Sequence, residues 1–455
     1  MKQKLFGTSG IRGIINVDLT PLLALDVGLA VATHTDAGKI TVGHDTRVSC
    51  PMLEDSLVSG LLAGGSTVYK LGLTTTPLLA FLTRELEANA GVMITASHNP
   101  PEYNGIKLFT IDSSAYDEEQ QNKIEEIIQN NLFKRSSWRN IGKETFLDES
   151  QRYIETIQKT VKLDKKWRVV IDPGCGAACH IAPTLFRMLG CKVIVVNAQP
   201  DGFFPGRSPV PETGTLRQLS RIVKNLHADI GIAYDGDGDR MATIDENGAF
   251  TPYDKILAAF ASHLVKKNKG GIVVTTVEAS RCFEKTVKPF GGKVIRTKVG
   301  DVYVAAAVKG NKAIFGGEPC GAWIHPQHHF CPDGVLSSVL LLKTLEEKNK
   351  PLSFLISEVP HHFLIRKEVT CPNNIKSEVV ENLKNALPMI FPEINEKSMV
   401  DGMRLTLKDG WILIRASGTE PILRLTVETE SKEKTKEIMN KGLKLIKQLI
   451  KEANR

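Results

Sequence analysis

The sequence lacks long hydrophobic runs, which excludes a protein that spans a membrane through helices. No apolar run reaches the ~18 residues that such a helix needs, and the first ten residues, MKQKLFGTSG, contain no apolar signal region. Low-complexity tracts are also missing, since 37 glycines and 22 prolines are spread over 455 residues, so disorder is not expected. We therefore expect a cytoplasmic protein without membrane partners.

Cysteine and clustered charge are scarce as well. Eight cysteines scattered over this length argue against a disulfide scaffold, and most are expected to be buried thiols. The net charge of +7 favours anionic ligands. However, no basic stripe interleaved with aromatic residues and no nucleic-acid-binding motif is present, so we expect no nucleic-acid partner.

The order of apolar segments predicts an α/β protein. At ~150 residues per domain, 455 residues suggest about three domains. Strand-like and helix-like segments alternate through residues 39–109, 167–234 and 254–299, which predicts βαβ units and mainly parallel sheets. Helices are expected to close the first unit within the charged segment 113–150. After about residue 365, MRLTLKDGWILIRASG and ILRLTVETE predict antiparallel strands around an Asp-Gly turn, so a fourth, α+β unit follows.

A serine lies at the end of one predicted strand, in GVMITASHNPPEYNGIKLF, residues 91–109. A serine at such a turn is usually a simple cap. The pair Ser97-His98 also suggests acyl transfer, but adjacent residues rarely form the required hydrogen bond, and no Gly-x-Ser-x-Gly elbow surrounds Ser97. Phosphoryl transfer needs positioning, charge neutralisation and a proton acceptor. Ser97 can carry the phosphoryl group, and Lys107 or His98 can take the proton.

Three aspartates follow another predicted strand, in YDGDGDRMATIDENG, residues 234–248. Asp235, Asp237 and Asp239 alternate with glycines, and their charges repel unless a hard cation such as Mg²⁺ or Ca²⁺ neutralises them. The EF-hand pattern is an alternative, because Glu246 falls at loop position 12. It fits poorly, since loop position 6 is Arg240 rather than glycine and the flanking segments are strands.

Two further loops offer groups for a phosphorylated sugar. RASGTEPILR, residues 415–424, can bind phosphate through guanidinium groups, hydroxyls and a flexible backbone, although a polar hairpin turn is the alternative. In FGGEPCGAWIHPQHHFCPDG, residues 315–334, Glu318 can accept hydrogen bonds from sugar hydroxyls. The same loop contains possible zinc ligands at spacings that match no standard zinc pattern: Cys320, His325, His328, His329 and Cys331.

Arg12 follows small residues in FGTSGIRG, residues 6–13, which alone indicates only an N-terminal turn. Taken together, TASHNP, DGDGDR, GGEPCG and RASGTEP, in this order, resemble the α-D-phosphohexomutase family over essentially the whole chain. The resemblance implies an α/β fold with three similar mixed α/β domains and a C-terminal α+β domain around a central cleft. The implied boundaries are 1–150, 151–252, 253–365 and 366–455, which corrects the count of three domains from length.

The resemblance also implies a reaction cycle. Phosphorylated Ser97 would donate its phosphoryl group to a sugar phosphate, and the resulting hexose 1,6-bisphosphate would reorient and return its other phosphoryl group. Hexose 6-phosphate and hexose 1-phosphate are thereby interconverted. Mg²⁺ would be bound by Asp235, Asp237, Asp239 and a phosphoserine oxygen. The implied catalytic residues are Ser97, Lys107 as general base, His98, Arg12 and Arg240; the implied substrate contacts are Glu318, Cys320, His325, Lys298, Arg415, Ser417, Gly418, Thr419 and Arg424.

Lys107 needs an unusual environment to act as a base. The pKa of a lysine in water is about 10.4, which is too high for a base at neutral pH. Burial, together with Mg²⁺ and Arg12 nearby, is expected to lower the pKa of Lys107.

GGEPCG, residues 316–321, corresponds by this resemblance to the family's sugar-binding loop; we call it the sugar loop, and it departs from the family pattern. Many members have serine and histidine where this chain has Cys320 and Ala322, and His325 is the expected substitute. Asp301 stands where several members have a histidine. The motifs look closest to the branch of phosphoglucosamine mutases and microbial phosphomannomutase/phosphoglucomutase enzymes. An acidic Asp301 or Glu318 near an amino group favours glucosamine phosphate, with mannose and glucose phosphates as alternatives.

Other function classes remain open from sequence alone. A metal-dependent phosphatase would use the same serine and metal with water as the acceptor. A non-catalytic protein that binds calcium or a sugar phosphate would need no transfer at all. The assembly is equally open, with a homodimer as the alternative to a monomer.

Overall fold

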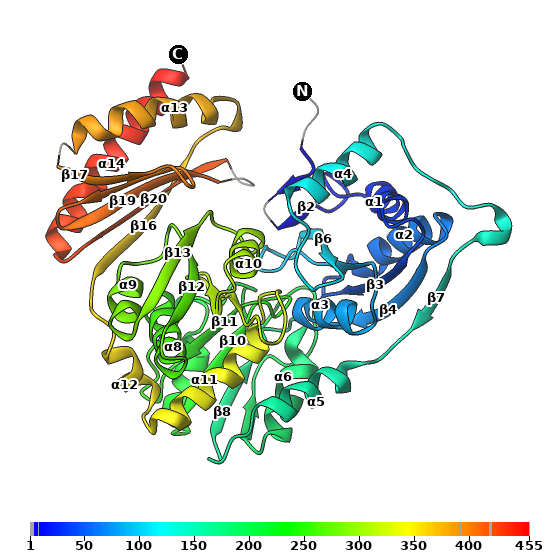
Figure 1. The fold of residues 1–455 in the computed structure, drawn as a ribbon, viewed down its shortest axis with the longest axis horizontal. Helices are drawn as coiled ribbons and strands as arrows, with labels where there is room; N and C mark the ends of the chain where they lie inside the picture. Colours follow the sequence, from blue (N-terminus) through cyan, green and yellow to red (C-terminus); the bar gives the residue numbers. More distant parts are fainter. Residues whose placement is uncertain (1–3, 8, 392, 418–420, 455) are drawn as a thin grey trace.

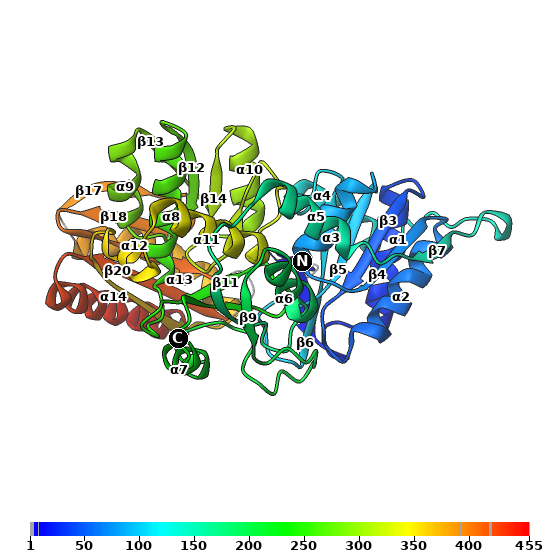
Figure 2. The same cartoon turned by 90° about the horizontal axis from the view of Figure 1, so that it is seen from below.

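The computed structural model describes residues 4–454 except 8, 392 and 418–420. Its strands form four sheets, and we call each sheet with its helices a unit, numbered I to IV along the chain (Figure 1). Figures 1 and 2 place unit I (blue) and unit IV (orange to red) at opposite ends of the molecule. None of the described helices is apolar over the length that a bilayer crossing requires.

Unit I is built on a seven-stranded sheet in the order β1-β2-β6-β5-β3-β4-β7. Its elements are β1 (Phe6–Gly7), β2 (Gly10–Ile14), α1 (Pro21–His34), β3 (Lys39–His44), α2 (Cys50–Ala63), β4 (Thr67–Leu73), α3 (Thr76–Glu85), β5 (Ala90–Ile94), β6 (Tyr103–Thr110), α4 (Glu118–Gln129), the 3₁₀ turn η1 (Trp138–Asn140) and β7 (Lys143–Phe146). The segment expected to be helical, 113–150, thus contributes α4 but also the edge strand β7.

The prediction of a mainly parallel sheet is wrong for half of unit I. Strands β5, β3, β4 and β7 are parallel neighbours, whereas β1, β2, β6 and β5 are antiparallel neighbours. Residues 95–102, which join β5 to β6, are too few for the crossover that a parallel pair needs. The chain therefore turns back beside β5, and Ser97 lies in this short turn.

Units II and III repeat one plan of three parallel strands and one antiparallel edge strand. Unit II, with sheet order β11-β10-β8-β9, contains α5 (Ser150–Thr160), β8 (Arg168–Asp172), α6 (Ala178–Met188), β9 (Lys192–Val195), α7 (Arg217–Asn225), β10 (Ile230–Tyr234) and β11 (Met241–Ile244). Unit III, with order β13-β12-β14-β15, contains α8 (Tyr253–Lys267), β12 (Gly271–Thr276), α9 (Cys282–Val287), the 3₁₀ turn η2 (Lys288–Phe290), β13 (Gly292–Thr297), α10 (Asp301–Gly310), β14 (Phe315–Gly317), β15 (Trp323–Ile324), α11 (Gly334–Lys348) and α12 (Leu352–Ser357).

Unit IV has a fully antiparallel sheet, β16-β20-β19-β18-β17, as expected for an α+β unit. Its elements are β16 (Phe363–Thr370), α13 (Asn373–Ile390), β17 (Ile394–Ser398), β18 (Met403–Leu407), β19 (Gly410–Ala416), β20 (Ile422–Thr429) and α14 (Lys432–Ala453). The Asp-Gly turn is confirmed, because Leu407 pairs with Gly410 across it. Together these sheets confirm three similar α/β units and one α+β unit.

The first three units share a hydrophobic core. One continuous cluster includes Phe81 of α3, Tyr153 of α5, Phe186 of α6, Phe260 of α8 and Leu342 of α11. Since these helices come from units I, II and III, the loops at their strand ends are held in fixed relative positions. Unit IV has a separate core between its sheet and its two helices.

A small cluster joins unit IV to unit III. Trp411 and Leu413 of β19 are buried against Val277, which follows β12. The guanidinium of Arg404 lies 4.1 Å from the centre of the Trp411 ring and donates a hydrogen bond to the Val277 carbonyl. Trp411 therefore anchors unit IV.

We predict that Trp411→Ala lowers the free energy of unfolding by about 3–5 kcal/mol, because it removes a fully buried ring and leaves a cavity. Trp138→Ala is the matched control, since Trp138 is 77% exposed; its effect should stay within about 0.5 kcal/mol. Urea titrations of the three proteins measure both values. Equal losses in the two variants would contradict the anchoring role.

Candidate active site

Ser97 lies in the turn after β5, where its backbone takes a left-handed conformation with φ = 52°. Its amide donates to Thr95 Oγ1 at 2.8 Å, which fixes the turn. The buried Ser97 hydroxyl donates to Asp235 Oδ2 at 2.8 Å and lies 3.2 Å from His98 Nδ1. The turn thus directs the hydroxyl of unit I into the aspartate loop of unit II.

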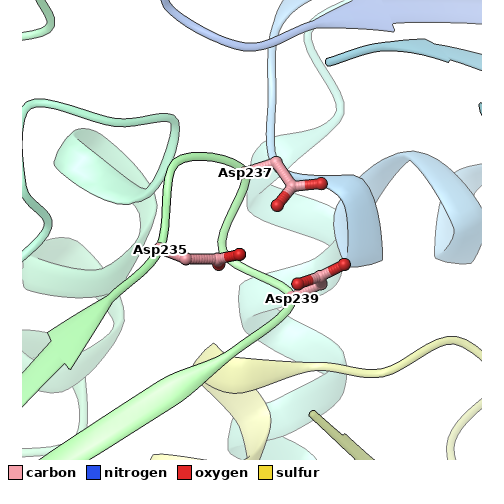
Figure 3. A group of neighbouring side chains, drawn as sticks. All are labelled: Asp235, Asp237 and Asp239. Atoms are coloured by element: carbon pink, nitrogen blue, oxygen red, sulfur yellow. The ribbon is translucent and has the colours of Figure 1, made fainter. Parts of the chain in front are cut away.

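The three aspartates follow β10 on one loop and converge (Figure 3). One carboxylate oxygen from each of Asp235, Asp237 and Asp239 lies within 4.8 Å of the others, and all three residues are buried. Two glycines shape this loop. Gly238 has φ = 76°, and Gly236 packs so closely that an added Cβ would lie 2.4 Å from the Ser97 carbonyl oxygen.

The donor set fits a hard divalent cation. The Oδ1 atoms of Asp237 and Asp239 are buried and accept no hydrogen bond within the described part of the chain. Burial raises the pKa of Asp235 well above its ordinary value, and the charges of Asp239 and Asp237 add to this effect. Oxygen ligands carrying uncompensated negative charge are what Mg²⁺ and Ca²⁺ bind.

Lys107, on β6, binds two of the three aspartates. Its ammonium donates to Asp237 Oδ2 and Asp239 Oδ2, at 2.8 Å each. Burial lowers the pKa of Lys107, but the negative charges of Asp237 and Asp239 outweigh burial, so the net pKa lies above the ordinary value. The expected lowering of this pKa is therefore wrong for the structure as it stands, because two ion pairs stabilise the charged form.

Three cationic or titratable side chains surround the Ser97 turn. Arg12 of β2 donates through Nη1 to Asn99 Oδ1 at 2.8 Å, and its pKa is lowered by burial and by Arg240. The positive charge of Arg240 and burial hold the pKa of His98 well below its ordinary value, so its imidazole is neutral at neutral pH. Arg240 Nε lies 3.8 Å from Asp239 Oδ1.

The sugar loop lies beside the aspartate loop. A backbone bridge pairs Arg240 with Ala322, and the loop between β14 and β15 brings in Glu318. Glu318 Oε2 accepts from the Gly300 amide at 3.0 Å. Burial, followed by the charge of Asp301, raises the pKa of Glu318 to about 8. Glu318 is therefore largely protonated at neutral pH.

Asp301 and Cys320 complete the surroundings of Glu318. Asp301 begins α10, and its Oδ1 accepts from the hydroxyl of Ser9 at 2.9 Å. A residue of unit I therefore contributes to the surroundings of Asp301. Burial raises the pKa of Cys320 to about 12, which keeps it a thiol.

His325 lies among aromatic residues of unit III. It is buried, its ring contacts Phe260 and Phe315, and its Nε2 lies 2.8 Å from Ser337 Oγ. A core of aromatic rings thus encloses the imidazole of His325, the residue expected to substitute in the sugar loop. Lys298 is exposed, with its ammonium 5.1 Å from the centre of the Tyr303 ring.

The zinc alternative finds no support in the structure. Among the described residues, the group of three or more possible metal ligands is the aspartate triad. His329 instead pairs with Asp333 at 2.9 Å, and the Tyr153 hydroxyl donates to the same carboxylate at 2.7 Å. His329 therefore belongs to a buried network that joins units II and III.

The predicted phosphate loop connects β19 and β20. Arg415 Nε lies 3.5 Å from Glu278 Oε2, and the Ser417 amide donates to the Ile422 carbonyl at 3.0 Å. Arg424 Nε donates to Glu368 Oε1 at 3.2 Å and pairs across the sheet with Arg415. Gly418 and Thr419, predicted to bind phosphate, lie outside the described residues.

Sequence reasoning missed Thr76, which begins α3. Its amide donates to the Asp237 carbonyl at 2.9 Å, and its hydroxyl donates to Asp237 Oδ2 at 2.5 Å. The positive end of a helix thus faces the aspartate loop. The run of threonines before Pro77 signals a helix start and could have indicated this position.

Comparison with known proteins agrees with this geometry. Four family models of phosphoglucomutase/phosphomannomutase match the chain: alpha/beta/alpha domain I at residues 3–135, domain II at 151–248, domain III at 252–363 and the C-terminal domain at 368–443. A solved phosphoglucomutase/phosphomannomutase family protein from Burkholderia thailandensis has a TM-score of 0.88 and 27% identity, covering 99% of this chain and 98% of that one.

Curated archaeal proteins are similar along their whole length. The chain is 45% identical to the "Probable phosphoglucosamine mutase" of Pyrococcus abyssi over 451 residues, 99% of each chain. It is also 45% identical to the protein of the same name from Methanothermobacter thermautotrophicus over 439 residues, 96% of each chain. With four matched domains and relatives of this identity, the chain belongs to the α-D-phosphohexomutase family.

Proposed function

We propose that this phosphohexomutase interconverts glucosamine 6-phosphate and glucosamine 1-phosphate through a phosphorylated Ser97 and a hexose 1,6-bisphosphate. The observation that carries the proposal is the hydrogen bond from the Ser97 hydroxyl to Asp235, inside a buried aspartate cluster. The names of the curated relatives support glucosamine phosphate as the substrate. Mannose and glucose phosphates remain the alternatives within the family.

Asp235, Asp237 and Asp239, with an oxygen on Ser97, would hold Mg²⁺. When bound, Mg²⁺ supplies positive charge that neutralises phosphoryl oxygens. Within the described part of the chain, the buried Oδ1 atoms of Asp237 and Asp239 accept no hydrogen bond, which supports this assignment. Hexose 1,6-bisphosphate would serve as activator, because it can phosphorylate Ser97 on an enzyme that has lost its phosphoryl group.

Lys107 and His98 would have different roles in proton transfer, because His98 is neutral and Lys107 is protonated. His98 is neutral and accepts or donates one hydrogen bond beside the Ser97 hydroxyl. Lys107 is held protonated by Asp237 and Asp239, so it acts as a general base only when the charge of those carboxylates is engaged elsewhere. Arg12 and Arg240 add positive charge at the reacting phosphoryl group.

The far end of the substrate would lie between units III and IV. Protonated Glu318 can donate a hydrogen bond to a sugar oxygen, and the side chain of Asp301 can accept from the ammonium group of glucosamine. Arg415, Ser417, Gly418, Thr419 and Arg424 would hold the phosphate that is not transferred, with Lys298 nearby. Because His325 is enclosed in the core, we leave it out of the proposed site.

We also propose the domain boundaries, the location and the assembly of the protein. We place the domain boundaries at 1–150, 151–252, 253–365 and 366–455. A cytoplasmic location suits eight free cysteines, since reducing compartments keep thiols reduced. A homodimer is the proposed alternative to a monomer.

We predict that the enzyme converts glucosamine 6-phosphate to the 1-phosphate in the presence of Mg²⁺ and a trace of bisphosphate. Ser97→Ala should lower kcat at least ~10³-fold, because the acceptor of the phosphoryl group is lost. Ser59→Ala, an exposed serine on α2, is the control and should behave as wild type. A coupled assay for the 1-phosphate measures each rate. Release of inorganic phosphate in place of the 1-phosphate would favour a phosphatase and contradict the proposal.

Substrate preference tests Asp301. We predict that Asp301→Asn lowers kcat/KM for glucosamine 6-phosphate about 10-fold relative to glucose 6-phosphate, because it removes one charged partner of the ammonium group. Glu118→Gln is the control. Glu118 is an acidic residue on the surface, and it accepts a hydrogen bond from Tyr303, which lies on the same helix as Asp301. Equal losses for both sugars in Asp301→Asn would refute the amine contact.

The pKa of Glu318 predicts a pH-dependent difference in stability. The carboxyl has a folded-state pKa of about 8 against an ordinary value of 4.5, so its stabilising contribution is complete below pH 4.5 and is lost as the pH rises towards 8. Glutamine does not titrate, so Glu318→Gln should not lose this contribution. The difference in free energy of unfolding between Glu318→Gln and wild type should therefore rise by roughly 2–4 kcal/mol as the pH increases over this range. Urea titrations at pH 5 and pH 8.5 measure the change; a difference that does not vary with pH would contradict the assigned pKa.

A further inference from the structure

Residues 95–102 of unit I, which contain Ser97 and which we call the phosphoserine turn, and the aspartate loop of unit II come from different units. Their relative position sets the contact between Ser97 and Asp235. A third segment touches both. It is DGFFPGR, residues 201–207 of unit II, which we call the brace loop. We propose that Phe204 of the brace loop is a positioning residue that fixes the phosphoserine turn against the aspartate loop; this inference rests on the proposed function.

Arg47 holds the phosphoserine turn in place. Its guanidinium donates to three backbone carbonyls of that turn, those of Ser97 at 3.0 Å, Asn99 at 2.7 Å and Pro100 at 2.6 Å, and to the carbonyl of Tyr103, the first residue of β6, at 2.8 Å. It also pairs with Asp45 at 3.1 Å and is 1% exposed. The position of the Ser97 backbone thus follows the position of this guanidinium.

Phe204 holds Arg47 in turn. The guanidinium lies 5.2 Å from the centre of the Phe204 ring, a distance at which a cation is attracted to the ring face. The Phe204 side chain is 5% exposed, and its backbone is left-handed with φ = 52°. A bulky residue keeps this conformation only where its surroundings impose it, so the contact with Arg47 is a built feature of the brace loop.

The same ring also lies close to the aspartate loop. Phe204 Cζ lies 3.6 Å from where a Cβ on Gly236 would stand, and Gly236 itself packs on the Ser97 carbonyl that Arg47 binds. The guanidinium of Arg47 and the backbone of Gly236 therefore meet at the Ser97 carbonyl oxygen, and the ring of Phe204 lies close to both of these residues.

Both ends of the brace loop are fixed. At its start, Gly202 lies against unit I, where an added Cβ would be 2.4 Å from the Thr46 carbonyl oxygen. At its end, Arg207 pairs with Asp172 at 3.1 Å and donates to the Tyr234 carbonyl at 2.6 Å, directly before Asp235. The loop thus joins the strand end that precedes the metal ligands to the arginine that holds the serine.

A purely structural role for Phe204 would predict a different outcome from a positioning role. If the ring only fills space, its removal lowers stability without affecting phosphoryl transfer to Ser97. If it positions the turn, its removal slows transfer while substrate affinity, which depends on units III and IV, is retained. The brace loop offers its own control, because the adjacent Phe203 is 70% exposed.

The test follows the phosphorylation of Ser97 by hexose 1,6-bisphosphate, measured by intact-protein mass spectrometry. In this transfer the bond from phosphorus to the sugar oxygen breaks, a bond to Ser97 Oγ forms, and the serine proton passes to the departing sugar oxygen. We expect Phe204→Ala to slow phosphorylation and lower kcat about 10- to 100-fold, with KM for the hexose phosphate little changed. Phe203→Ala should match wild type.

Phe204→Leu covers the case in which the alanine variant does not fold, because it keeps most of the buried volume without an aromatic face. We expect Phe204→Leu to melt near wild type and still be phosphorylated more slowly. Phosphorylation of Phe204→Leu or folded Phe204→Ala at the wild-type rate would overturn the inference. Failure of the wild-type protein to become phosphorylated on Ser97 would instead overturn the proposed function.

Discussion

The site depends on the burial of three carboxylates next to the Ser97 hydroxyl. Asp235, Asp237 and Asp239 are removed from water, and the ammonium of Lys107 satisfies only part of their charge. Such a cluster is costly unless positive charge compensates it. The same negative charge keeps Lys107 protonated and directs the Ser97 hydroxyl towards Asp235. The negative charge of the cluster therefore explains three features together: its affinity for a cation, the protonation of Lys107 and the orientation of the Ser97 hydroxyl.

The fold makes this cluster possible by aligning strand ends from separate units. Ser97 follows β5 and Asp235 follows β10, and a shared core fixes the sheets that carry them. Glu318 reaches the same region because Arg240 pairs with Ala322 across the two loops. Buried arginines then tie these loops down by donating to backbone carbonyls, as Arg47 does at the serine turn. Rigid strand ends thus hold loops that would otherwise move.

Sequence patterns predicted those features that arise locally. The strand before Ser97 and the Asp-Gly alternation after Tyr234 are visible in a short window, so the turn and the aspartate loop could be expected. Features set by long-range packing could not. His325 lies in a core of aromatic rings, and the state of Lys107 depends on aspartates 130 or more residues away. Phe204 gives no signal at all in sequence, because its role arises only from contact with Arg47.

The central physical claim is that the aspartate cluster and Ser97 together form a cation site that Lys107 partly compensates in the free protein. Crystals soaked with Mn²⁺ test it most directly through anomalous diffraction, since Mn²⁺ takes the oxygen ligands that Mg²⁺ takes. We predict one strong anomalous peak within coordination distance of Asp235, Asp237, Asp239 and the Ser97 side chain. An anomalous map with no peak there, in crystals where the three carboxylates remain clustered, would contradict the claim.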